Sequence, residues 1–279
     1  MLLNEGLETI SLRCFEQCGV EKIVSPHTLR YVEDGAFIDC QSLKLVDFAK
    51  SALESIGETA FAYSGLESFT APPSLRAIGE SAFFDCNLLR HVDLSGMQRQ
   101  GSISLSALAF SHSCLEDIRL PRTLRVIEKG TFQSCKSLRS VTFPDGSELE
   151  EIREAAFQGS GLESFVAPPS LRKIGDMAFA RCPLKYFQLN EGIQEIGWLC
   201  LWNTGVSPET LPNTWTPEHV GLQEDPKVLR LPDGIETIDN NWFRECEIET
   251  LIVPSSVRSF GMCAFADCIH LREVILLFN

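Results

Sequence analysis

The side chains best suited to chemistry in this chain of 279 residues are eleven cysteines and five histidines. Cys14 and Cys18 form a C-x3-C pair, and Cys263 and Cys268 form a C-x4-C pair. A zinc finger needs a second cysteine or histidine pair at matching spacing, and neither pair has one. The sequence therefore predicts no metal site, and no motif in it points to a cofactor.

A hydrolytic triad can be drawn around His91. His91 and Asp93 should point outward from one strand, and Ser68 or Ser140 would lie on a strand nearby. Such a triad would stand on an open sheet, without the pocket and oxyanion hole that acyl transfer requires. The sequence also lacks GxGxxG, GxxxxGK[ST], HExxH and GxSxG. We therefore predict that the chain is not an enzyme.

The cysteines follow a repeat. Seven of them share one position: Cys18, Cys40, Cys86, Cys135, Cys182, Cys246 and Cys268. In other copies the same position holds Ser64, Ser113, Ser160 or Thr204. A position that accepts these three types requires a small buried side chain. We interpret the cysteines as reduced packing thiols, with disulfides as the alternative.

The elements that must position all these residues are copies of one repeat. Residues 65–86 (GLESFTAPPSLRAIGESAFFDC) and 161–182 (GLESFVAPPSLRKIGDMAFARC) agree at 16 of 22 positions. Looser copies fill nearly all the rest, each anchored by Phe15, Phe37, Phe61, Phe83, Phe110, Phe132, Phe157, Phe179, Leu201, Phe243 or Phe265. Such self-similarity is typical of a solenoid. We expect one domain over residues 1–279 with about 11–12 repeats.

Charges support parallel stacking of these copies. Each copy holds two short apolar patterns with strand spacing, and the charge after the first leucine alternates in sign, as in Glu67, Arg90 and Glu116. Neighbouring parallel strands lie about 4.8 Å apart, so each charge would lie between two opposite ones. Exposed pairs stabilise weakly, by about 0.2–1 kcal/mol, so we expect them mainly to set register.

The pattern LxxIxLPxxLxxIGxxAFxxC resembles the BspA-like leucine-rich repeats of bacterial surface proteins and some protists. The resemblance covers essentially the whole chain. It implies a mainly β, curved, right-handed solenoid with a parallel sheet on its concave face and short second strands and turns on its convex side. It also implies adhesion or protein binding without catalytic residues.

The repeat becomes irregular between Leu201 and Phe243. We interpret this stretch as a degenerate repeat over 203–226, with its strand over 206–212, followed by a normal repeat. All four tryptophans lie between residues 198 and 242. They either form a binding site, since tryptophan is enriched at interface hot spots, or fill the space left by a damaged repeat.

The predicted function is therefore a non-catalytic protein-binding or adhesion module, with a structural scaffold module of a larger multidomain protein as the alternative. The partner would be a protein ligand of unknown identity. The candidate binding residues lie in the irregular region and on the concave face: Trp202, Trp215, His219, Trp242, Tyr186, Gln188, Arg230 and Val228.

Charge and the chain ends limit the remaining classes. A net charge of −14 disfavours nucleic acid and anionic membranes. No apolar run approaches the roughly 20 residues of a membrane helix. The first residues do not resemble a signal peptide, so we expect a cytoplasmic protein if the chain is complete and a surface or secreted protein if it is a fragment. Neither end of the solenoid has a polar cap. We therefore expect either that neighbouring parts of a larger protein cover the ends, or that the ends of two molecules associate with each other.

Overall fold

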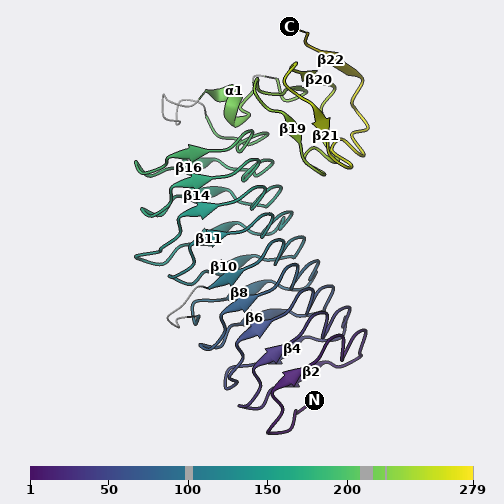
Figure 1. Cartoon of the computed structure of the whole chain (residues 1–279), viewed down its shortest axis with the longest axis vertical. Helices are drawn as coiled ribbons and strands as arrows, with labels where there is room; N and C mark the ends of the chain where they lie inside the picture. Colours follow the sequence, from purple (N-terminus) through teal and green to yellow (C-terminus); the bar gives the residue numbers. More distant parts are fainter. Residues whose placement is uncertain (98–102, 208–215, 224, 279) are drawn as a thin grey trace.

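The computed structural model describes residues 1–97, 103–207, 216–223 and 225–278. In these ranges the chain is a parallel β-solenoid of about eleven turns with one short helix (Figure 1). Each coil contributes one longer strand, one shorter strand and a turn that carries the anchor phenylalanine. The predicted fold class, a mainly β leucine-rich-repeat solenoid, is confirmed.

The longer strands form one row along the solenoid. They are β2 (Lys22–Val24), β4 (Leu45–Asp47), β6 (Ser68–Thr70), β8 (His91–Asp93), β10 (Asp117–Arg119), β12 (Ser140–Thr142), β14 (Ser164–Val166), β16 (Tyr186–Gln188), β18 (Val228–Arg230), β20 (Thr250–Val253) and β22 (Glu273–Leu276). Their pairing is parallel and in register, with Ile118 opposite both Val92 and Val141.

The shorter strands form a second row. They are β1 (Thr9–Ile10), β3 (Tyr31–Val32), β5 (Ser55–Ile56), β7 (Ala77–Ile78), β9 (Ser104–Leu105), β11 (Val126–Ile127), β13 (Glu151–Ile152), β15 (Lys173–Ile174), β17 (Glu195–Ile196), β19 (Thr237–Ile238) and β21 (Ser259–Phe260). This row also pairs in parallel, as in Ile56 opposite Ile78.

The anchor phenylalanines stack directly on one another through the core. Ring centroids lie 5.1–5.8 Å apart along one phenylalanine ladder: Phe15, Phe37, Phe61, Phe83, Phe110, Phe132, Phe157 and Phe179. Offset stacking at such spacing is favourable beyond the burial of the rings alone. The sequence spacing of these residues therefore did predict their alignment.

Each anchor sits in a turn that the sequence did not reveal. Ser81 (φ 54°) and Asp85 (φ 53°) flank Phe83 at two positions before and after it, and both adopt left-handed backbone. That conformation costs a non-glycine residue about 1–2 kcal/mol. The turn persists because the buried ring and inter-coil bonds such as Phe83 N–H to Ala109 C=O (2.8 Å) hold it.

The cysteine position has a more specific requirement than small size. The Cys86 thiol donates to the carbonyl of Phe61 in the preceding coil (3.1 Å), and the Ser113 hydroxyl donates to the carbonyl of Phe110 (2.6 Å). Burial raises the pKa of the Cys86 thiol to about 12, so it stays protonated. The position selects a small hydrogen-bond donor, which Cys, Ser and Thr all supply. All eleven cysteines are free thiols in the structure.

Recurrent glycines allow the coils to approach closely. A Cβ on Gly79 would lie 2.6 Å from the carbonyl carbon of Gly57, and a Cβ on Gly261 would lie 2.6 Å from the backbone nitrogen of Asn240. Backbone atoms cannot move aside as side chains can, so these positions exclude any larger residue.

The alternating charges meet in part of the row, although within the described ranges Glu67 pairs with neither Lys44 nor Arg90. Arg139 and Lys185 lie 3.3 and 3.2 Å from Glu163 on the intervening coil, and Arg30 lies 2.8 Å from Glu54. Most of these side chains are about half exposed, so they favour one register more than they stabilise the fold.

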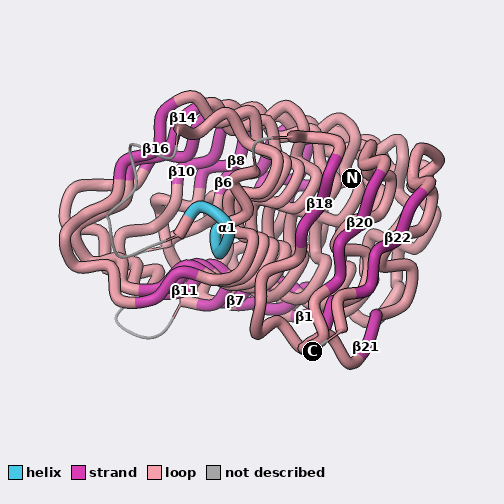
Figure 2. Tube along the Cα trace, turned by 90° about the horizontal axis from the view of Figure 1, so that it is seen from above, coloured by secondary structure: helices cyan, strands magenta, loops and turns pink. Residues whose placement is uncertain are grey.

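The stack breaks after β17. Among the described residues β16 pairs with β14 alone, while β18 pairs with β20 and begins a new sheet. We call residues 1–206 with α1 (Pro217–Val220) the first block, and residues 225–278 the second block. The hydrophobic core is likewise divided into two clusters. The second block lies beside the upper end of the first, not on top of it (Figures 1 and 2).

Helix α1 closes the first block. Leu199 N–H donates to His219 C=O and Leu201 N–H to Val220 C=O, both at 2.8 Å, which repeats the bonds between earlier coils. The next anchor position therefore falls on Gly221, where a Cβ would lie 2.9 Å from the Cβ of Trp202. No ring fits there, so the phenylalanine ladder, which stops at Phe179 because Leu201 occupies the next anchor position, does not resume in the first block. Of the strand expected over 206–212, residues 206 and 207 are not in a strand, and the rest lies outside the described residues.

Candidate functional site

The two blocks are joined by a buried tryptophan. The indole N–H of Trp242 donates to Glu154 Oε1 (2.9 Å), and its carbonyl accepts from Gln158 Nε2 (2.8 Å). Lys129 Nζ lies 2.9 Å from Glu154 and 3.5 Å from Asp239. These partners are separated by 84 to 110 residues in the sequence. The second block is thus attached side-on to turns of the later coils of the first block.

Trp202 completes this junction from the other side. Its ring packs edge-on against Phe243, with centroids 4.8 Å apart, and shares a core with Met177 and Leu199. Trp202 is 5% exposed and Trp242 is 4% exposed. Both tryptophans were predicted from the sequence to be binding residues. The structure instead gives both rings an internal packing role, because each is covered by its own chain.

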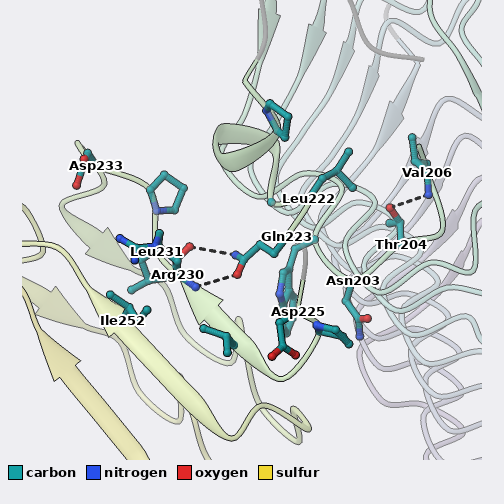
Figure 3. Close-up of a pocket in the computed structure, with 16 residues that line it drawn as sticks. Asn203, Thr204, Val206, Leu222, Gln223, Asp225, Arg230, Leu231, Asp233 and Ile252 are labelled. Atoms are coloured by element: carbon teal, nitrogen blue, oxygen red, sulfur yellow. Dashed lines mark hydrogen bonds between the residues drawn. The ribbon is translucent and has the colours of Figure 1, made fainter. Parts of the chain in front are cut away.

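A groove of about 830 Å³ opens beside this junction (Figure 3). One wall is formed by Trp202 to Val206 and by the segment from Gly221 to Gln223, and the other by β18 with Ile252 of β20. Three of the predicted binding residues line the groove: Trp202, through the small exposed part of its ring, Val228 and Arg230. The groove lies where both strand rows are interrupted.

The other predicted residues lie elsewhere. Tyr186 is 53% exposed on β16, and its hydroxyl donates to the side-chain oxygen of Gln188 on the same strand. His219 is half-buried; its Nε2 lies 2.9 Å from the carbonyl of Ile196, and its ring centroid lies 4.0 Å from that of Trp198. Trp215 lies outside the described residues. The structure therefore does not bring Tyr186, Gln188 or His219 into the groove.

The sequence analysis did not single out Gln223, which faces the groove from the linker (Figure 3). Its side-chain Oε1 accepts from Arg230 N–H (2.9 Å), and its Nε2 donates to Arg230 C=O (3.0 Å). Asp225 and Asp233 add two carboxylates to the lining. Because Gln223 lies within the degenerate repeat predicted over 203–226, no periodic pattern marked it.

The drawn triad has a different geometry from the one expected. His91 Nδ1 lies 2.6 Å from Asp117 Oδ2 on the neighbouring β10, whereas Asp93 accepts from Ser95 and faces Arg119. The His91 and Asp117 side chains are 59% and 56% exposed. Solvent surrounds this pair, so it is a cross-strand contact of the polar face and not an enclosed reactive site.

The described ranges contain neither a cluster of metal ligands nor a membrane-spanning helix. There, no three His, Cys, Asp or Glu side chains are grouped so that they could hold a metal ion. In those ranges, too, no helix has the length and apolar character needed to cross a membrane.

Comparison with known proteins agrees with the fold. The family model of the BspA-type leucine-rich repeat region (6 copies) matches residues 8–107, 103–217 and 225–279. No curated protein matches the chain. The crystal structure of the pneumococcal vaccine antigen PcpA is similar at 22% identity and a TM-score of 0.61, covering 97% of this chain and 67% of that one.

Two other solved structures are similar at lower TM-scores. A leucine-rich repeat protein from Bacteroides ovatus has 21% identity and a TM-score of 0.45, covering 96% of this chain and 82% of that one. A leucine-rich cell surface protein from Faecalibacterium prausnitzii has 20% identity and a TM-score of 0.44, covering 98% and 84%.

Repeat proteins of this kind are commonly protein-binding or surface proteins, and their solenoids are typically non-enzymatic. The family match extends over nearly all of the sequence, and the coils show the stacked phenylalanines and the small donor that the repeat encodes. The chain belongs to the BspA-type leucine-rich repeat family.

Proposed function

We propose that this chain is a non-catalytic protein-binding module and that the groove between the two blocks is its binding site. The observation that carries the proposal is the groove itself, about 830 Å³ in volume, at the one place in the described residues where both strand rows are interrupted together. Ligand sites are typically concave, of roughly 300–1,000 Å³, with apolar walls and a few polar groups. Val228 and Ile252 supply apolar surface, and Arg230 supplies a polar group.

The long-strand face supports binding less well. Its larger apolar side chains are separated along the row, with Leu45 38% exposed, Val166 52% and Tyr186 53%. Between them lie charged pairs such as Arg139 with Glu163, which already satisfy each other. The net charge of −14 favours a protein partner over a nucleic acid, because it repels the phosphate backbone.

The test uses a displayed library of random peptides of about 10 residues, which is the upper end of the usual length of a β-strand. We expect selected peptides to lose binding to Ile252→Arg, in which a charge enters the groove. The matched control is Val166→Arg, which adds the same charge on the exposed face of β14, and binding to it should persist. Failure to select any peptide, or equal sensitivity to both variants, would contradict the proposal.

A second candidate function, a scaffold that associates end to end, is favoured by open apolar surface at both ends of the solenoid. Val274 and Leu276 of β22 are each 53% exposed and Phe278 is 86% exposed, while Leu2 and Leu12 are 77% and 62% exposed. Sedimentation of wild type against Val274→Lys separates the two functions. Oligomers that dissociate in this variant would support the scaffold, and a monomer in both would reject it.

A further inference from the structure

The edge of β18 is the most unusual feature of the groove. In a sheet, a strand without a neighbour presents backbone N–H and C=O groups that can pair with another chain. In a parallel ladder both backbone groups of a given residue point to the same side. Both groups of Arg230 bond to Gln223, so they point away from β20 and into the groove.

The amide of Gln223 occupies the place of a neighbouring strand. It accepts from Arg230 N–H at 2.9 Å and donates to Arg230 C=O at 3.0 Å. These are the two bonds that an antiparallel strand exchanges with a residue opposite it. A side-chain amide has the same donor and acceptor as a peptide unit, so it satisfies the edge until a peptide replaces it.

We propose that the groove binds an extended peptide by strand addition to the edge of β18, with which no strand of the described residues pairs, and that Gln223 is a displaceable substitute for the incoming backbone at Arg230. The N–H of Val228, the other outward-facing residue of this edge, already donates to the Asp225 carbonyl (3.2 Å), so the peptide would pair mainly at Arg230. This inference rests on the proposed function and specifies its partner and mode. In strand addition, backbone bonds provide affinity and surface contacts with alternate side chains provide specificity.

The lining defines the chemistry of the peptide. Val228, Ile252 and Leu222 offer apolar surface on either side of the edge, so alternate apolar side chains should lie against them. Two carboxylates, Asp225 and Asp233, line the groove against the single guanidinium of Arg230. Charge complementarity therefore favours a peptide with a lysine or arginine beside its apolar residues.

The closing experiment uses the library-selected peptide and a scan in which each backbone N–H in turn is methylated. Strand addition predicts loss of binding by about tenfold or more at alternate positions and little change between them, because only every second N–H faces β18. Uniform loss, or loss unrelated to the alternation, would overturn the inference.

Variants of Gln223 supply the second readout. Gln223→Ala removes the competing amide, so the peptide should bind about threefold to tenfold more tightly, in the range of one hydrogen bond. Gln223→Met retains side-chain length and should act in the same way, which separates competition from loss of packing. Gln41→Ala, which removes an exposed amide of the first block outside the groove, is the matched control and should leave affinity unchanged.

Hydrogen exchange provides a check that needs no affinity. In Gln223→Ala the Arg230 amide should exchange faster than in wild type, and the bound peptide should slow it again. Strand addition would be rejected if the peptides depend on Ile252 but the methylation scan shows no alternation, or if Gln223→Ala binds them more weakly. Either result would still agree with the proposed binding groove. A library that yields no binder would reject both.

Discussion

The two blocks are made of the same repeat but are held in different ways. In the first block each coil rests on its neighbour through the phenylalanine ladder and two strand rows. In the second block the rings of Phe243 and Phe265 stack again, with centroids 4.9 Å apart. The block as a whole, however, contacts the first block through Trp242 and Lys129. Stacking therefore sets the coil, while individual polar contacts set where the second block lies.

This difference shows how a repeat protein can create a concave site. Within the first block only one strand row at a time is interrupted, between β4 and β6, between β9 and β11, and between β12 and β14, so the stack keeps a regular polar face. With Leu201 and then Gly221 at the next two anchor positions, no phenylalanine continues the ladder, and the sheet that restarts at β18 has an edge with which no strand of the described residues pairs. The groove follows from that interruption, so its properties should change separately from those of the coils.

The largest expected effect is in the first block. Phe83→Ala removes a fully buried ring from the phenylalanine ladder and should lower the free energy of unfolding by about 3–5 kcal/mol. Hydrogen exchange should increase mainly in the adjoining coils, since repeat contacts are chiefly between neighbours. Phe265→Ala, at a half-buried ring of the second block, should cost less. Uniform loosening along the whole chain would refute this view of the stack.

The next effect concerns close packing between coils. Gly79→Ala places a Cβ about 2.6 Å from backbone of Gly57 and should destabilise by about 1–3 kcal/mol. Gly261→Ala meets the same obstacle in the second block and should cost a similar amount, because both blocks share this contact. Gly19→Ala, which meets no atom within 4 Å, is the control for urea unfolding. Equal behaviour of all three would contradict the proposed close approach.

A smaller effect should distinguish the contacts between the two blocks from the stacking of coils within each block. Trp242→Phe keeps an aromatic ring but removes the N–H that bonds to Glu154, at a cost of about 1.5 kcal/mol. We expect the second block to loosen first, seen as a larger radius of gyration and an earlier fluorescence transition. Fluorescence suits this test because all tryptophans lie between residues 198 and 242. Unchanged dimensions and a single shifted transition would argue against separable blocks.

The smallest effect is a pH dependence at the junction. Burial raises the pKa of Asp176, the carboxylates of Glu154 and Asp239 act in the same direction, and the bond from Trp198 N–H opposes them. Because the folded-state pKa is raised, Asp176 adds stability at low pH that is lost as pH rises through that pKa. Asp176→Asn should therefore gain less than about 1 kcal/mol at neutral pH and flatten the profile. A loss at neutral pH would reverse this sign.

Most of the coil was readable from residue spacing. Phe83, Gly79 and Cys86 recur because each contacts its counterpart one coil away, and a contact between neighbouring copies leaves a periodic trace. The left-handed residues around each anchor were not readable, since the same position holds Ser81, Leu108 and Met177 in different coils and the conformation is imposed by the packed ring. The sequence predicts an irregular stretch over residues 203–226, but of the side chains that line the groove it singled out only Trp202, Val228 and Arg230.

The repeating pattern alone established that the chain stacks as a parallel solenoid and that order fails near residues 203–226. Only the folded molecule decided that Trp202 and Trp242 turn inward, that the second block lies beside the first, and that Gln223 meets the edge of β18. The physical reason is that these contacts occur once, between residues outside the repeat or many coils apart. A single contact has no period, so nothing in the spacing of residues announces it.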